Sequence, residues 1–129
     1  MASPTVPVIV VVTDDAEVRA ALTAVIESRG IGVIAYRAPA EVFDQRDVFS
    51  GICMIVDMDL PGGGVDLVKR LRAQGNRNPT ILVAKTIDNA IQSAAASVDA
   101  IALLEIPVLP LVLFAAIGEA LTPRVREGD

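Results

Sequence analysis

Three aspartates are placed in the sequence where they could act together on a metal ion or a phosphoryl group. Asp14 and Asp15 follow the apolar run Val8–Val12, and Asp57 follows a second apolar run that ends at Val56. Three carboxylates that lie close together repel one another, so their clustering is costly unless a cation lies among them. Mg²⁺ prefers oxygen ligands and commonly uses one or two carboxylates together with phosphate and water. We therefore expect a Mg²⁺ site beside an aspartate that can be phosphorylated.

A simpler role for Asp14 and Asp15 is open as well. The two residues stand just before a segment with helical periodicity. Aspartate is a favoured N-cap residue, and its charge suits the positive end of a helix dipole. Taken by themselves, these two residues could simply cap the first helix. Asp57, at the end of another strand, is what favours the metal site.

Segments of two alternating kinds must position these aspartates. Val8–Val12 is a continuous β-branched run, typical of a strand buried on both faces of a parallel sheet. Between Glu17 and Arg29 the apolar residues recur at the spacing of a surface helix, and Gly30 is a natural helix stop. The same patterns predict strands at 8–12, 31–36, 52–56, 80–84 and 100–104, and helices at 17–29, from 39 onward, 65–72, 88–97 and 111–121.

Alternating strands and helices imply a parallel sheet with helices on both faces. Right-handed crossovers leave few topologies, and we expect a doubly wound, five-stranded α/β sheet in the flavodoxin-like order 2-1-3-4-5. The working site of such a sheet lies at the carboxyl ends of the strands, near the switch in strand order. Strands one and three are neighbours there, so the three aspartates should meet at one edge. We expect one domain over residues 1–122 and a polar tail over residues 123–129.

Composition narrows the classes of function. The 129 residues carry 11 Lys and Arg against 16 Asp and Glu, a net charge of −5 that disfavours nucleic-acid binding. Glu105, Pro107 and Pro110 interrupt the most apolar segment, so we expect no membrane span. The start of the chain lacks the basic region of a secretory signal, and the single cysteine, Cys53, is expected to be buried. We expect a cytoplasmic protein. Because the chain has no histidine, any phosphoryl group must come from another molecule.

The segment from Ile55 to Gly62 resembles the phosphoacceptor loop of bacterial response-regulator receiver domains, in particular those like chemotaxis regulators. Asp14 and Asp15 resemble the acidic pair of that family, and the resemblance covers about residues 7 to 121. It implies that Asp57 is the phosphoacceptor. It further implies that Asp15, Asp57 and the backbone carbonyl of Asp59 bind Mg²⁺, with Asp14 helping through water. A histidine kinase or another phosphodonor protein would then be a partner, and the chain would be a signalling domain, not an enzyme.

Other positions depart from the family pattern. Receivers carry Thr or Ser at the end of strand four, where this chain has Ala84, and a Lys just before a Pro after strand five, where it has Ile106 preceded by Glu105. The aromatic switch residue of strand five corresponds to Leu103. The residues that bind the phosphoryl group and metal are therefore present, whereas those that respond to phosphorylation are missing. Lys85 and Thr86 follow Ala84 and could take over their roles, or could point to solvent.

These departures favour an atypical receiver, or pseudo-receiver, that acts through protein–protein contacts. A normally phosphorylated receiver with altered kinetics is the alternative. A function of another class is suggested by Asp57-Met58-Asp59, which also resembles the nucleophile loop of haloacid-dehalogenase-like phosphatases. In those enzymes the motif follows the first strand, whereas here it follows the third predicted strand.

The last predicted helix contains a run of seven apolar residues, Leu111–Ile117. Only one side of this helix can cover the sheet, so its other side should leave apolar residues exposed. The fourth predicted helix, about residues 90–98, has few polar residues as well. We expect the fourth helix, the fifth strand and the fifth helix to form a face for a homodimer or a partner protein.

Overall fold

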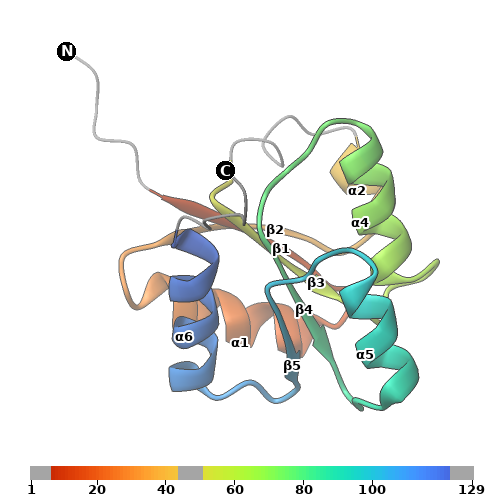
Figure 1. Ribbon diagram of the computed structural model, residues 1–129. Coiled ribbons are helices and arrows are strands. Elements are labelled where there is room, and N and C mark those ends of the chain that lie inside the picture. Colours follow the sequence, from red (N-terminus) through yellow and green to blue (C-terminus); the bar gives the residue numbers. More distant parts are fainter. Residues whose placement is uncertain (1–6, 44–50, 123–129) are drawn as a thin grey trace.

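The computed structural model of the chain describes residues 7–43 and 51–122. The predicted tail, 123–129, lies outside the described residues. Strands and helices alternate along the chain (Figure 1). The strands are β1 (Val8–Val12), β2 (Gly32–Tyr36), β3 (Cys53–Asp57), β4 (Thr80–Ala84) and β5 (Ala102–Glu105). The helices are α1 (Ala16–Glu27), α2 (Pro39–Phe43), α4 (Gly64–Ala73), α5 (Asn89–Ala96) and α6 (Pro110–Leu121).

The five strands form one sheet in the order β2-β1-β3-β4-β5, and every neighbouring pair is parallel. This confirms the predicted fold class and strand order. The central strands β1, β3 and β4 are almost entirely buried, which is why their sequences are continuous β-branched and aliphatic runs. The edge strand β5 is only half-buried along Ala102–Leu104.

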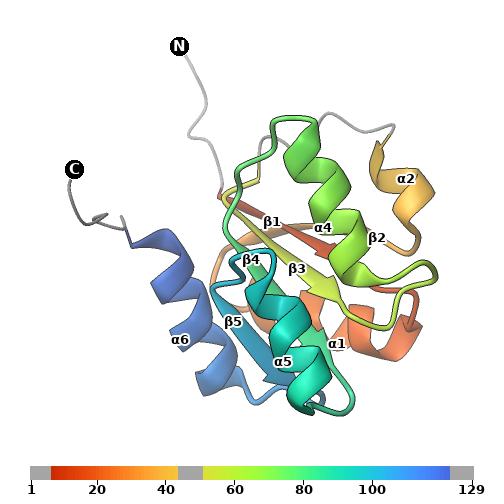
Figure 2. The same cartoon turned by 45° about the vertical axis from the view of Figure 1, so that its right-hand side comes forward.

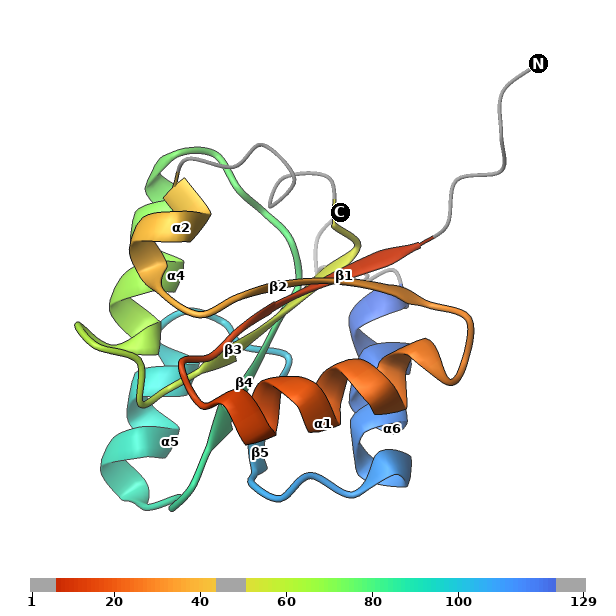
Figure 3. The same cartoon turned by 180° about the vertical axis from the view of Figure 1, so that it is seen from behind.

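Helices cover both faces of the sheet. Figure 3 shows α1 and α6 on one side and α2, α4 and α5 on the other. Each face has its own core. Alternate residues of β1 illustrate this: Ile9 and Val11 pack with α1 and α6, whereas Val10 and Val12 pack toward α2, α4 and α5. The period-two alternation of strand side chains distributes one apolar run between two cores.

Several element boundaries differ from the predicted ones by one or two residues. Strand β3 begins at Cys53 and includes Asp57, because Asp57 is still in register with Val83 of β4. Helix α1 ends at Glu27, before the turn in which Gly30 has φ +77°. Among the residues that the structure describes, no helix is long and apolar enough to cross a membrane.

Candidate functional site

Asp57 lies at the carboxyl end of β3 and is only 1% exposed. Its two carboxylate oxygens accept different hydrogen bonds. Oδ2 accepts one from the hydroxyl of Thr13 over 2.7 Å, and Oδ1 accepts one from the backbone amide of Asp59 over 2.8 Å. A buried carboxylate needs such donors, because burial without them is costly. Both oxygens are therefore already engaged by the protein.

Thr13 is brought to Asp57 by the sheet register. Val12 pairs with Val56 across β1 and β3, so the next residues on the two strands are Thr13 and Asp57. Thr13 is fully buried, and its backbone amide donates to the carbonyl of Tyr36, which extends the β1–β2 ladder by one residue. The Thr13 carbonyl accepts a hydrogen bond from Arg19 Nη1 over 2.9 Å. The residue that follows β1 and lies beside Asp57 thus presents a fixed, uncharged hydroxyl.

Asp15 is the N-cap of α1. Its Oδ1 accepts hydrogen bonds from the backbone amides of Glu17 at 2.9 Å and Val18 at 3.2 Å, so the capping role left open by the sequence is one that Asp15 performs. Its Oδ2 lies 3.8 Å from Lys85 Nζ. The amide of Val18 is the main cause that holds the pKa of Asp15 below its usual range, and Lys85 adds to it. Asp15 therefore stays ionised, with its charge directed to α1 and Lys85.

The two other predicted metal ligands are exposed. The side chain of Asp14 is on the surface, and so is Asp59, which meets Asp57 through its backbone amide. Within residues 7–43 and 51–122, no group of three or more His, Cys, Asp or Glu side chains is arranged to hold a metal ion. With Asp15 engaged in its cap and Thr13 beside Asp57, the side chains fit Mg²⁺ poorly in this arrangement.

The loop after Asp57 approaches the backbone of β3 closely. Gly62 and Gly63 have φ values of +84° and +90°, a conformation that residues with a Cβ rarely adopt. Gly64 begins α4, and a Cβ there would collide with the backbone carbonyl of Asp57. The three glycines therefore serve the tight passage from β3 to α4.

The positions that respond to phosphorylation in receivers have different residues here. Ala84 ends β4, is buried, and pairs in register with the exposed Glu105 of β5. Leu103 is half-buried and packs against the core on the α4 and α5 side. Ile106, half-buried, packs against the other core and precedes Pro107. A hydroxyl, a lysine and an aromatic ring are thus replaced by three aliphatic side chains.

Lys85 and Thr86 lie on the surface just after β4. The ion pair of Lys85 with Asp15 places its ammonium at the same edge of the sheet as Asp57. Its predicted action on Asp57 stays a prediction, as does that of Thr86.

Thr13 is the site residue that the sequence patterns did not single out. Three polar residues follow one another after β1, and only the register tells which of them faces Asp57. The available signal was its place directly after the strand, since Thr13 and Asp57 are each the first polar residue after an apolar run.

Comparisons with known proteins agree with this architecture. The family model described as "Response regulator receiver domain" matches residues 9–117. The transcriptional regulatory protein FixJ of Bradyrhizobium diazoefficiens is 30% identical over 100 residues, 77% of this chain and 49% of that protein. FixJ of Azorhizobium caulinodans is 29% identical over 119 residues, 92% of this chain and 56% of that protein. The chain thus spans about half the length of these relatives.

A solved structure extends the likeness to the fold. The response regulator receiver protein from Pseudoalteromonas atlantica superimposes with a TM-score of 0.81 at 23% identity, over 88% of this chain and 96% of that one. The strand order, the buried aspartate that ends β3 and the family match over residues 9–117 lead to one assignment. This chain belongs to the response regulator receiver domain family of two-component signalling.

Proposed function

We propose that this domain is an atypical receiver, which signals through protein–protein contacts and depends little on phosphorylation of Asp57. The observation that carries the proposal is the hydrogen bond of 2.7 Å from Thr13 to Asp57. It occupies the oxygen that a metal ion or an incoming phosphoryl group would need. A hydrogen bond to a charged group contributes about 1.5–3 kcal/mol, so displacing Thr13 is costly.

The surroundings of Asp57 support the same proposal. A phosphoryl group would add negative charge to an edge that already carries Asp14, Asp59 and Glu105 on its surface. Neither the side chain of Ala84 nor that of Ile106 can donate a hydrogen bond or a charge to it. A modification shifts a conformational equilibrium only through contacts that differ between the two states. Without a hydroxyl and a lysine at these positions, phosphorylated and unphosphorylated forms should differ little.

A phosphorylated receiver with altered kinetics is the second candidate, and Lys85 favours it. Its ammonium lies 3.8 Å from Asp15 Oδ2 and is 64% exposed, so it has room to turn toward a phosphoryl group on Asp57. A histidine kinase or other phosphodonor protein would then be its partner. This candidate predicts slow phosphorylation that depends on Lys85.

Mg²⁺ binding, on this proposal, is weak. Asp57 and the backbone carbonyl of Asp59 would hold the ion, with Asp15 joining only by giving up its cap of α1. When bound, Mg²⁺ would neutralise charge on a transferred phosphoryl group. Asp15 is stabilised in its cap by two backbone amides, and this opposes the rearrangement.

The contacts through which the domain signals are proposed to lie on α5, β5 and α6. Figure 2 shows these three elements side by side at one edge of the molecule. Leu109, Leu111 and Val112 at the start of α6 are 66%, 80% and 44% exposed. The edge strand β5 is only half-buried. Exposed apolar residues beside the edge strand of the sheet suit a second copy of this chain, which offers the same edge in return.

Incubation with acetyl phosphate and Mg²⁺, followed by intact mass measurement, tests the proposal. We expect a small phosphorylated fraction, which Asp57→Asn abolishes. The same assay on Lys85→Gln separates the two candidates, because only the altered-kinetics candidate predicts a further loss. Rapid, stoichiometric phosphorylation of the wild-type protein with widespread amide NMR shifts would refute the atypical receiver.

A further inference from the structure

A polar cleft lies at the edge of the sheet opposite to Asp57. It has a volume of about 700 Å³ and lies where β4 and β5 begin, between the end of α4, the α5–β5 turn and the end of α6. This volume is within the range of small-molecule sites. Its charged lining residues, among those that the structure describes, are Lys69, Arg72, Arg77 and Asp99. Three cations against one anion stand out in a chain whose net charge is −5.

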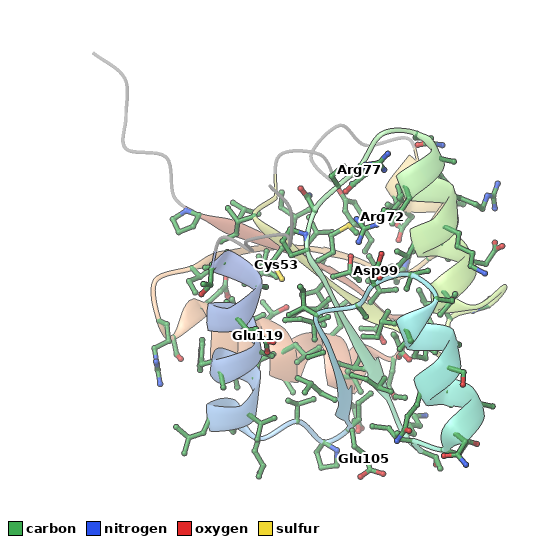
Figure 4. All side chains as sticks on the ribbon, viewed as in Figure 1. Cys53, Arg72, Arg77, Asp99, Glu105 and Glu119 are labelled. Carbon is green, nitrogen blue, oxygen red and sulfur yellow. The ribbon has the colours of Figure 1, made fainter. Side chains whose placement is uncertain are left out.

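In the described part of the chain, none of these cations forms an ion pair with an acidic side chain. The ion pairs there join Arg37 with Glu41, Arg70 with Asp66, and Lys85 with Asp15, and none involves the cleft. Figure 4 shows the side chains of Arg72, Arg77 and Asp99 in the same region, far from Glu105. Burial and the charge of Arg77 lower the pKa of Arg72, and Asp99 opposes this only in part. An anion in the cleft would relieve this repulsion.

The two guanidinium groups are held in place by backbone carbonyls. Arg72 Nη1 donates to the carbonyls of Asn76 at 3.3 Å and Asn78 at 2.8 Å, and its Nη2 donates to Thr80 Oγ1 at 3.3 Å. Arg77 Nη1 donates to the carbonyls of Arg72 at 2.8 Å and Asn76 at 3.4 Å. Among the described residues, none accepts a hydrogen bond from the Nη2 group of Arg77. Fixed guanidinium groups lose little entropy on binding and match phosphate geometry.

We propose that this cleft binds a small molecule bearing a phosphate or diphosphate group, through Lys69, Arg72 and Arg77. The site is separate from Asp57, so an occupant could act on the domain whether or not Asp57 is modified. The competing explanation is purely structural, since both arginines also hold the α4–β4 connection together. Lys69 distinguishes the binding explanation from the structural one. No hydrogen bond or ion pair in the described residues gives Lys69 a structural role, so an effect of its substitution on binding would support the proposal.

Titration of the full chain with inorganic pyrophosphate in Mg²⁺-free buffer tests the proposal. We expect saturable amide NMR shifts at residues 77, 97–99 and 122, with the amides of Asp57 and Asp59 unchanged. Lys69→Gln combined with Arg77→Gln should weaken binding about tenfold or more. Arg70→Gln is the matched control on the same helix and should bind as the wild type does. Citrate, a polycarboxylate of similar charge, should bind more weakly than pyrophosphate.

Asp99→Asn keeps the test decisive if the double variant does not fold. Asp99 has φ +53°, a conformation that asparagine also tolerates. Removing the one acidic side chain among the described lining residues should strengthen pyrophosphate binding about threefold, and a gain of affinity cannot come from unfolding. The proposal fails if millimolar pyrophosphate gives no saturable shifts, if the shifts centre on Asp57, or if Asp99→Asn has no effect. Citrate binding as tight as pyrophosphate would overturn the phosphate preference.

Discussion

The hydroxyl of Thr13 donates a 2.7 Å hydrogen bond to Asp57 Oδ2, and both residues are buried. This contact joins the ends of β1 and β3, the place where the family resemblance implies a metal-binding acidic pair. A hydroxyl satisfies the Asp57 carboxylate without a cation. Asp15, two residues after Thr13, caps α1. Because groups of the protein itself donate hydrogen bonds to both carboxylate oxygens of Asp57, we expect the domain to depend only weakly on a bound metal ion.

Thr13→Asp should increase the affinity for Mg²⁺. It places a second carboxylate beside Asp57, so the variant should be less stable than wild type without metal, because like charges repel in a buried site. Mg²⁺ should reverse this loss. A tenfold gain in affinity corresponds to about 1.4 kcal/mol of added stabilisation at saturating metal. Urea unfolding with and without MgCl₂ measures the effect.

Two variants control this prediction. Thr13→Val removes the hydroxyl without adding charge, and should destabilise the protein by about 1–3 kcal/mol with no gain in Mg²⁺ affinity. Thr13→Asp combined with Asp57→Asn should lose the gain. An equal response to Mg²⁺ in wild type and Thr13→Asp would show that Thr13 does not control the metal site.

Beryllofluoride, a phosphoryl mimic, should cause only local changes in the wild-type protein. We expect amide shifts near Asp57 and Lys85, and little change along β5 and α6, since Ala84 has no hydroxyl to be drawn toward the mimic. Ala84→Thr combined with Ile106→Lys should extend the shifts to β5. Large shifts along β5 and α6 of the wild type would contradict the expectation.

The sequence predicted the fold well for a physical reason. Strands such as Val8–Val12 are buried on both faces, and their continuous apolar runs contrast with the helical periodicity of α1. Alternation of the two patterns leaves few topologies. Strand ends were less certain, because the ladder that carries β3 through Asp57 depends on pairing with β4. The residue pattern within β3 alone does not specify its pairing with β4.

The candidate site was only partly predictable. Asp57 was identified, whereas the role of Thr13 depends on the register between β1 and β3, and the side-chain direction of Asp15 depends on the helix it caps. Similarly, the run Leu111–Ile117 is apolar all round, so its sequence does not tell which side faces the core. The structure buries Leu113 and exposes Leu111.

Leu111→Glu should weaken self-association without harming the fold. Leu111 is 80% exposed, so a charge there remains solvated in the monomer but would be buried in a dimer built on α5, β5 and α6. Sedimentation velocity over a range of concentrations should show a wild-type dimer and a variant monomer of unchanged melting temperature. Leu113→Ala is the contrasting core variant, expected to cost about 2–5 kcal/mol. Wild-type protein that stays monomeric at the highest concentration would rule out the dimer.

Gly64→Ala should destabilise the domain and disturb the Asp57 loop. The added Cβ would meet the backbone carbonyl of Asp57, which cannot move without distorting β3. Overpacking of this kind costs about 1–3 kcal/mol. Gly118→Ala is the matched control in α6, where a Cβ meets nothing within 4 Å. There alanine should stabilise the protein by about 0.5–1 kcal/mol. Chemical denaturation of both variants measures the contrast.

Cys53 should make the stability of the domain fall at alkaline pH. The thiol is fully buried in the core on the α1 and α6 side of the sheet, and desolvation raises its pKa from an ordinary value of 9.0 to about 12. The folded state therefore keeps the proton that the unfolded chain releases above pH 9. The contribution of the protonated thiol to the free energy of unfolding is fully present below pH 9. It declines as pH rises toward 12, by at most about 1.4 kcal/mol per pH unit.

Urea unfolding at pH 8 and pH 10 measures the decline. Cys53→Ala supplies the control, because it lacks the thiol and is otherwise identical in sequence. The difference in stability between wild type and Cys53→Ala should shrink from pH 8 to pH 10, and a difference that stays constant would show that the thiol ionises as readily in the folded state as in the unfolded one.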